Sequence, residues 1–272
     1  MNNYNNSIEI IKKWYDILWP DGKYNKELEE LFKKYPSLPS ANINKYKFDT
    51  SDEYAGYNFL MCLYFCDELE KKYKQRGIPN TVLLDSLYDI VILTDLHYDS
   101  KGFFGIAEIN WIRETLMFKL FRIGRLQFMK APCYTDIPEI TVRKDDDILE
   151  IHIPSGKPLL ECEVINSIKN AKDFFLMYFP EQDYKCFTCY SWLLDDTLNG
   201  FLREDSNILK FQRMFKLVCK DESIDVLRHT INMAITEENF TQYKPNNAFT
   251  ERVMNHLKSG GKFYTSLGYI LK

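Results

Sequence analysis

The segment from residue 149 to residue 215 constrains the fold more than any other part of the chain. It begins with a strand pattern that ends in residues 150–154, Glu-Ile-His-Ile-Pro, and continues through a short loop with glycine and proline. Apolar residues then recur at helical spacing from about Leu160 to Tyr178, and a second strand pattern follows over 186–193. This order of strand, loop, helix and strand predicts a unit that presents polar groups at its strand ends.

The overall composition is that of a packed globular protein. The 272 residues are 45% hydrophobic and 15% aromatic, enough for one large or two small domains with their own cores. The formal net charge is −4, without the basic surplus of a nucleic-acid-binding protein. The polar stretch at residues 1–6 lacks the features of a signal peptide, and the apolar runs are shorter than the roughly 20 residues of a membrane span. We therefore expect a cytoplasmic protein with no membrane span.

The spacing of apolar residues changes near Phe118. Before it, helical spacing predicts a bundle with helices over about 7–18, 23–35, 51–77, 81–96 and 106–117. After it, alternating patterns predict strands over 120–129, 139–144, 148–153, 186–193, 208–218 and 263–271, with helices over 160–178 and 250–258. The chain is thus expected to be α+β, with a helical domain over 1–117 and a mixed domain over 118–272.

The cysteines indicate reduced thiols rather than a metal site. Their odd number, in a chain without an export signal, is typical of a reducing compartment. Cys186 and Cys189 form a CxxC motif inside a strand pattern, where residues three apart point to opposite faces. No second CxxC or paired histidine accompanies them, so no metal is expected. The seven cysteines are residues 62, 66, 133, 162, 186, 189 and 219.

His152 is the first candidate for a catalytic residue. In residues 149–153 the odd positions are apolar and the even ones polar, so Glu150 and His152 are expected on one face of a strand. A neutral imidazole can accept a proton from an amine or a hydroxyl near pH 7. The same pattern also fits a surface or hydrogen-bonded structural histidine.

The loop after this strand is a candidate anion site. Ser155, Gly156 and Lys157 lead into a predicted helix, whose first N–H groups and positive dipole end suit a phosphate. The loop has a single glycine, and Glu161 and Glu163 fall in the first helical turn. These two carboxylates would repel an anion unless they point away, and they also suit the helix dipole.

Tyr190 and Ser191 in the second strand could donate a proton to a leaving group. Ser191 with His152 could also form a nucleophile and base, although no GxSxG motif surrounds Ser191. Core packing is the alternative for Tyr190.

A glycine at position 124 interrupts the predicted strand over 120–129. Glycine within a strand marks a bulge or a close approach to a ligand. Arg125 and Gln127 after it are expected on one face, where they line a polar cleft or are simply solvated.

Short motifs along the second half of the chain together resemble a known family. They are similar to the bacterial acyltransferase-like proteins that join a helical N-acyltransferase N-terminal domain to a GNAT-like C-terminal domain. The resemblance covers most of 118–219, and more loosely the two-domain layout of the whole chain. In chain order the motifs are Gly124–Phe128, His152–Pro154 with Pro158-Leu159, Phe174-Phe175 with Tyr178–Pro180, Ser191–Asp195, and Ser206–Ile208 with Phe211-Gln212.

The resemblance implies a GNAT-like mixed or antiparallel sheet flanked by helices. In such a sheet, two splayed strands, 148–153 and 186–193, admit the pantetheine of an acyl-CoA, and the loop 154–158 holds its pyrophosphate. The implied activity is transfer of an acyl group from an acyl-CoA, or another acyl-thioester, to an amine of a small molecule or peptide. His152 would be the base and Tyr190 or Ser191 the proton donor to the thiolate. The donor-binding residues would be Ile153, Ser155, Gly156, Lys157, Arg125 and Gln127.

One departure from the GNAT pattern leaves an alternative open. The loop lacks the Arg/Gln-x-x-Gly-x-Gly/Ala motif of ordinary GNAT enzymes. A catalytically inactive GNAT-like module that senses an acyl-CoA or binds a protein partner is therefore the alternative to an acyltransferase.

Overall fold

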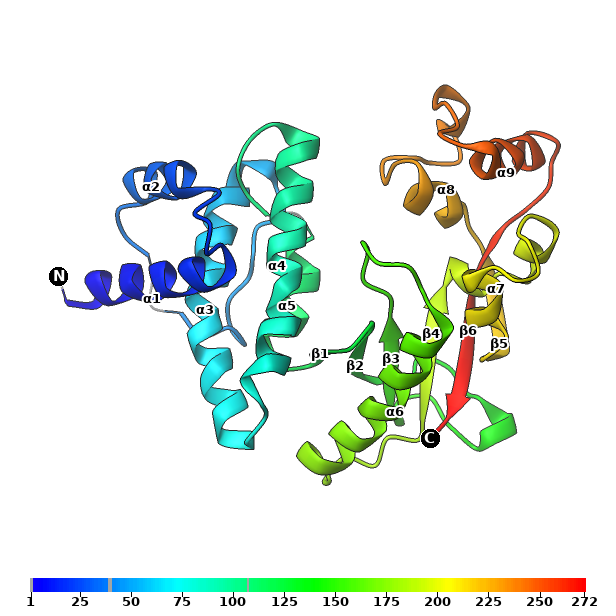
Figure 1. Ribbon diagram of the computed structural model, residues 1–272, viewed down its shortest axis with the longest axis horizontal. Helices are drawn as coiled ribbons and strands as arrows, with labels where there is room; N and C mark the ends of the chain where they lie inside the picture. Colours follow the sequence, from blue (N-terminus) through cyan, green and yellow to red (C-terminus); the bar gives the residue numbers. More distant parts are fainter. Residues whose placement is uncertain (1, 39–40, 107) are drawn as a thin grey trace. The chain divides into compact units, whose positions relative to one another are not determined.

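The computed structural model describes residues 2–38, 41–106 and 108–272. The chain divides into two compact units, Met1–Ile123 and Gly124–Lys272. Figure 1 shows helices in the first unit and a sheet with helices in the second. Within the described residues, no helix has the length and apolar content needed to cross a membrane.

The first unit is a group of helices with an aromatic core. Trp19, Phe59 and Phe104 are in ring contact, with centroid distances of 5.5 Å and 4.7 Å to Phe59. The helix that ends at Arg76 is stopped by Gly77, whose φ of 70° is left-handed. The helical pattern predicted here is confirmed, with end points that move by several residues. The elements are α1 (Asn2–Leu18), α2 (Asn25–Lys34), η1 (Asp52–Tyr54), α3 (Ala55–Arg76), α4 (Asn80–Lys101), α5 (Ile109–Leu116) and the strand β1 (Leu120–Ile123).

The second unit is built on a mixed sheet. The strands of this unit lie in the order β2-β3-β4-β6-β5, which makes β5 an edge strand. β3 and β4 are parallel, whereas β2–β3, β4–β6 and β5–β6 are antiparallel. The strands of this unit are β2 (Leu126–Pro132), β3 (Asp147–His152), β4 (Cys186–Ser191), β5 (Lys216–Glu222) and β6 (Tyr264–Leu271).

Helix α6 (Glu161–Tyr178) packs on one face of this sheet through aromatic side chains. Phe175 of α6 contacts Tyr184 at 5.9 Å, Tyr184 contacts Phe187 of β4 at 5.8 Å, and Phe187 contacts Phe128 of β2 at 5.7 Å. We call this the covered face. Smaller helices form a second apolar cluster: α7 (Asn207–Gln212), α8 (Asp225–Thr230) and α9 (Ala248–Lys258).

Three strand predictions are wrong, each for a local reason. The strand expected over 120–129 is two strands, because Gly124 has a left-handed φ of 68° and turns the chain. The strand expected over 139–144 is replaced by a 3₁₀ turn at Pro138–Ile140 and one isolated bridge. The strand expected over 208–218 begins as helix α7, because the Ser206 hydroxyl accepts a hydrogen bond from the Leu209 N–H and caps that helix.

Candidate functional site

The strand register brings polar side chains together on the face opposite α6. Gln127 on β2 lies opposite His152 on β3, and Glu150 on β3 lies opposite Thr188 on β4. Residues two apart in a strand share a face, so Tyr190 joins Thr188 there. We call Gln127, Glu150, His152, Thr188 and Tyr190 the polar face. The sequence prediction of one polar face at His152 is thereby extended across three strands.

His152 is the last residue of β3 and is partly open to solvent. The side chains of His152 and Glu150 are each 23% exposed, and the imidazole Nε2 lies 3.6 Å from the Glu150 Oε2. Gln127, across the register, is 2% exposed. His152 therefore lies beside a carboxylate and an amide on the polar face.

The two parallel strands of the unit separate toward their C-terminal ends. Among the described residues, β3 and β4 pair only at Leu149–Phe187 and Glu150–Thr188. Beyond these pairs, β3 still pairs with β2 as far as His152, and β4 still pairs with β6 as far as Ser191. Past Glu150, the register between β3 and β4 thus ends, while each strand stays paired with its other neighbour.

The loop from Ile153 to Leu160 joins the open end of β3 to α6. Ser155, Gly156 and Lys157 in it are exposed. The first N–H groups of α6 have no partner within the helix, as at every helix N-terminus, and the dipole is positive there. Of the two first-turn carboxylates, Glu161 lies 3.8 Å from the Lys210 ammonium, which offsets its charge.

The Arg125 guanidinium is hydrogen-bonded to the backbone of this loop. Its Nε donates to the Pro158 carbonyl at 3.0 Å, its Nη1 to the Pro154 carbonyl at 2.8 Å, and its Nη2 to the Lys157 carbonyl at 2.6 Å. Its backbone N–H donates to the Ser167 hydroxyl of α6 at 2.7 Å. The prediction that Arg125 shares a strand face with Gln127 is wrong, because Arg125 lies in the turn before β2. Arg125 is only 7% exposed, and its guanidinium contacts the backbone carbonyls of the loop.

Tyr190 and Ser191 point to opposite faces of β4. The Tyr190 hydroxyl donates to the Asp221 carboxylate at 2.9 Å, and burial together with this carboxylate raises the pKa of Tyr190 to about 12. The Ser191 hydroxyl accepts from the Leu193 N–H at 3.1 Å and caps the 3₁₀ turn η3 (Trp192–Leu194). The structure therefore brings Tyr190 and His152 to one face and does not bring Ser191 to His152.

The CxxC motif lies within β4, so its two cysteines alternate between the faces. Both Cys186 and Cys189 are buried, and burial raises the pKa of the Cys186 thiol to about 12 and that of the Cys189 thiol further. A buried, protonated thiol is a poor nucleophile and a poor metal ligand. In the described part of the chain, no group of three or more His, Cys, Asp or Glu residues is placed to hold a metal ion.

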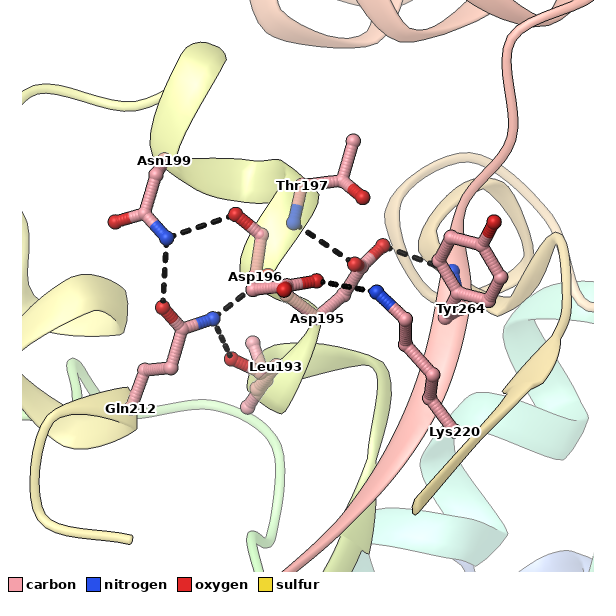
Figure 2. A network of polar contacts seen from close by, with 8 residues as sticks. All are labelled: Leu193, Asp195, Asp196, Thr197, Asn199, Gln212, Lys220 and Tyr264. Atoms are coloured by element: carbon pink, nitrogen blue, oxygen red, sulfur yellow. Dashed lines mark hydrogen bonds and ion pairs between the residues drawn. The ribbon is translucent and has the colours of Figure 1, made fainter. Parts of the chain in front are cut away.

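A network of hydrogen bonds surrounds the buried carboxylate of Asp195, just after β4. No role was predicted for this residue from the sequence. The Asp195 carboxylate, 1% exposed, accepts from the Thr197 N–H at 2.9 Å and the Tyr264 N–H at 2.8 Å, as Figure 2 shows. The Gln212 amide donates to the Asp195 carbonyl at 2.6 Å. Burial raises the pKa of the Asp195 carboxyl. Asp195 and Gln212 each belong to a motif that carries the family resemblance, Ser191–Asp195 and Phe211-Gln212, so the sequence could have indicated their importance. Their hydrogen bonds connect the end of β4 to β6 and α7.

Comparison with known proteins agrees with this architecture. A family model described as the GNAT-like C-terminal domain matches residues 120–270, more than half of the chain. The chain belongs to this family. The N-acyltransferase N-terminal domain model matches residues 9–117 of the same GNAT-like protein. The family prediction and the α+β fold class are thus confirmed.

Solved structures share the fold of this GNAT-like protein. An acyltransferase in complex with decanoyl-CoA and teicoplanin is 25% identical with a TM-score of 0.69, over 80% of this chain and 66% of that chain. An acyltransferase in complex with decanoyl-CoA is 23% identical with a TM-score of 0.69, over 90% of this chain and 75% of that chain. The chain thus spans 66% of the length of the first of these structures. A search of curated proteins found no match.

Proposed function

We propose that this protein transfers an acyl group from an acyl-CoA to an amine. The observation that carries the proposal is the separation of the parallel strands β3 and β4 past Glu150, above a loop that enters the N-terminus of α6. Such an opening suits the pantetheine arm, which needs backbone hydrogen-bond partners. Family membership and the structural neighbour bound to decanoyl-CoA support the same donor.

The donor would bind along the loop and the strand ends. Its pyrophosphate would accept hydrogen bonds from the loop N–H groups at Ser155 and Gly156 and from the first turn of α6, with Lys157 adding a positive charge. Arg125 would act by keeping the loop carbonyls turned inward, so that the N–H groups face the ligand. The N–H of Ile153 would stabilise the oxyanion that forms on the thioester carbonyl.

His152 would serve as the general base. The acceptor ammonium gives one proton to the imidazole, and the neutral nitrogen then attacks the thioester carbon. The C–N bond forms, the C–S bond breaks, and the nitrogen loses its second proton. The imidazolium of His152 would then give its proton to the departing sulfur, while the second nitrogen proton passes to water. Tyr190, the other donor that the resemblance implies, is held by Asp221, and its raised pKa makes it the weaker acid. Overall, ammonium and thioester yield amide, thiol and one proton.

A non-catalytic acyl-CoA sensor or protein-interaction module is the second candidate. It is favoured by the single glycine of the loop and by Glu163, which is exposed in the first turn of α6 beside the expected phosphate position. This candidate predicts binding of a thioester without release of thiol.

The decisive experiment combines ligand binding with turnover. A ligand at about 100 times its dissociation constant adds roughly 2.7 kcal/mol to stability, so thermal unfolding should shift with CoA, acetyl-CoA or decanoyl-CoA. Lys157→Ala should reduce that shift, whereas Lys185→Ala, which changes an exposed lysine at the start of β4, should not. Release of free thiol upon addition of an amine identifies an acyltransferase, and a shift without thiol release identifies the sensor. No shift with any of the three compounds would refute both the acyltransferase and the acyl-CoA sensor, and would leave the protein-interaction module.

A further inference from the structure

Three side chains at the β5 side of the polar face form a cluster with its own chemistry. Tyr134, from the segment after β2, and Tyr190 have ring centroids 6.0 Å apart and ring planes at 80°. The Tyr190 hydroxyl donates to the Asp221 carboxylate of the edge strand β5 at 2.9 Å. We call Tyr134, Tyr190 and Asp221 the aromatic corner.

The aromatic corner is open to solvent and carries a negative charge. Tyr134 is 49% exposed and Tyr190 is 40% exposed. Burial raises the pKa of Tyr190 most, followed by the hydrogen bond to the Asp221 carboxylate, and the Asp225 carboxylate and the Cys219 thiol add to the rise. Two aromatic rings beside a carboxylate attract an ammonium group through their π faces and through the full negative charge.

A second carboxylate, that of Asp225, acts on Tyr190 of the aromatic corner. Thr265 lies opposite Asp221 in the register, and its hydroxyl donates to the Asp225 carboxylate at 2.9 Å. Asp225 also lines a pocket of about 530 Å³ together with Glu222, Glu237, Glu238 and Arg228. Arg228 pairs with Asp225 at 3.1 Å, and Lys262 pairs with Glu222. Tyr134, Tyr190 and Asp221 are not among the residues that line this pocket, so the aromatic corner is itself a site for one ammonium group.

The group held at the aromatic corner cannot be the amine that reacts. A site that stabilises an ammonium ion opposes loss of its proton, whereas the nucleophile has to be neutral. Distance points the same way: Asp221 is on β5 and His152 on β3, three strands apart in the order β3-β4-β6-β5. Neighbouring strands are about 4.8 Å apart, so the separation is about 14 Å.

We propose that the aromatic corner binds a second, non-reacting ammonium group of the acceptor, which makes the acceptor a diamine or polyamine. The role as acceptor rests on the acyl transfer proposed above. Binding of the ammonium group does not, and it is measured without any acyl-CoA present.

The binding test uses spermidine as the probe and butylamine as its singly charged counterpart. At constant ionic strength, spermidine should shift the backbone amide resonances of Tyr134, Tyr190 and Asp221, and it should bind more tightly than butylamine. Asp221→Asn and Tyr134→Leu should each weaken spermidine binding about tenfold. The control Asp183→Asn removes a carboxylate whose side chain is 78% exposed, before β4, and should leave binding unchanged. Equal weakening by Asp221→Asn and Asp183→Asn, or no shift at the corner, would overturn the proposal.

The turnover test compares two acceptors with a fixed acyl-CoA. The ratio of kcat/KM for spermidine to that for butylamine should exceed ten and fall about tenfold in Asp221→Asn. This ratio cancels any general effect of the variant on Tyr190. If acyl-CoA binds and butylamine is acylated but the ratio is near one, the aromatic corner is refuted and the acyl transfer stands. If spermidine binds but no acyl-CoA does, the acyl transfer fails and the ammonium site stands.

Discussion

Replacing Arg125 by methionine should loosen the loop that we assign to the donor pyrophosphate. Methionine keeps most of the apolar stem but removes the guanidinium. Three backbone carbonyls then lose a charged donor: those of Pro154, Lys157 and Pro158. The Arg125 backbone N–H keeps its bond to Ser167, so the turn before β2 is retained.

The expected loss of stability follows from how exposed those carbonyls are. A hydrogen bond to a charged group contributes about 1.5–3 kcal/mol, so three would contribute about 4.5–9 kcal/mol if none were replaced. Lys157 and Pro158 are exposed, and water can replace their donors. Pro154 is buried and cannot recover its bond so easily. We therefore expect Arg125→Met to lower the free energy of unfolding by about 2–4 kcal/mol.

Urea unfolding and hydrogen exchange would measure this effect. Faster exchange of the amides over 153–164, beyond that of the rest of the sheet, would locate the change in the loop, and affinity for CoA should fall about tenfold. Arg125→Lys keeps the charge but reaches only one carbonyl at a time, so it should recover less than half of the loss. Arg203→Met is the matched control, because the Arg203 side chain is 85% exposed and pairs with nearby Asp205.

A loss of less than about 0.5 kcal/mol in Arg125→Met would refute this reasoning, because surface substitutions reach that size. A large loss of stability with unchanged exchange over 153–164 would also refute it, since the guanidinium would then stabilise something other than the loop.

Three further outcomes are expected. Gly124→Ala should lower the free energy of unfolding by about 1–3 kcal/mol and Gly77→Ala by only about 1 kcal/mol. Both glycines have a left-handed φ, but of the two only Gly124 would place the added Cβ against another atom, Ser167 Oγ at 2.8 Å. Equal losses in urea unfolding would exclude that contact. His152→Gln should lower kcat by about 10²–10⁴-fold with the melting temperature unchanged, and a loss under tenfold would remove His152 as the base. Burial raises the pKa of Asp195 above 3.8, so the folded state keeps this proton to higher pH than the unfolded chain, and stability from this group falls as pH rises above 3.8. Asp195→Asn cannot titrate, so its stability deficit should narrow as pH rises; a constant deficit would contradict the assignment.

Local patterns predicted the elements that carry the site. Helical spacing located α3, α4 and α6 to within a few residues, because an amphipathic helix is defined by contacts along one continuous segment. The strand ending at His152 and the loop with Lys157 were predicted for the same reason. The turn at Gly124 was not, because a glycine within an alternating pattern fits a bulge as well as a hairpin.

The sequence by itself determined the helical character of the first half, the order of strand, loop, helix and strand over 149–193, the polar character of one side of β3, and the family. Tertiary structure alone decided which strands are neighbours, and so which polar residues meet. The proximity of Tyr190 and Asp221 depends on β6 lying between β4 and β5. The attachment of Arg125 to the loop carbonyls spans about 30 residues of chain, with separations of 29 to 33 positions. Such contacts depend on strand pairing over long separations, which no periodicity within a single segment records.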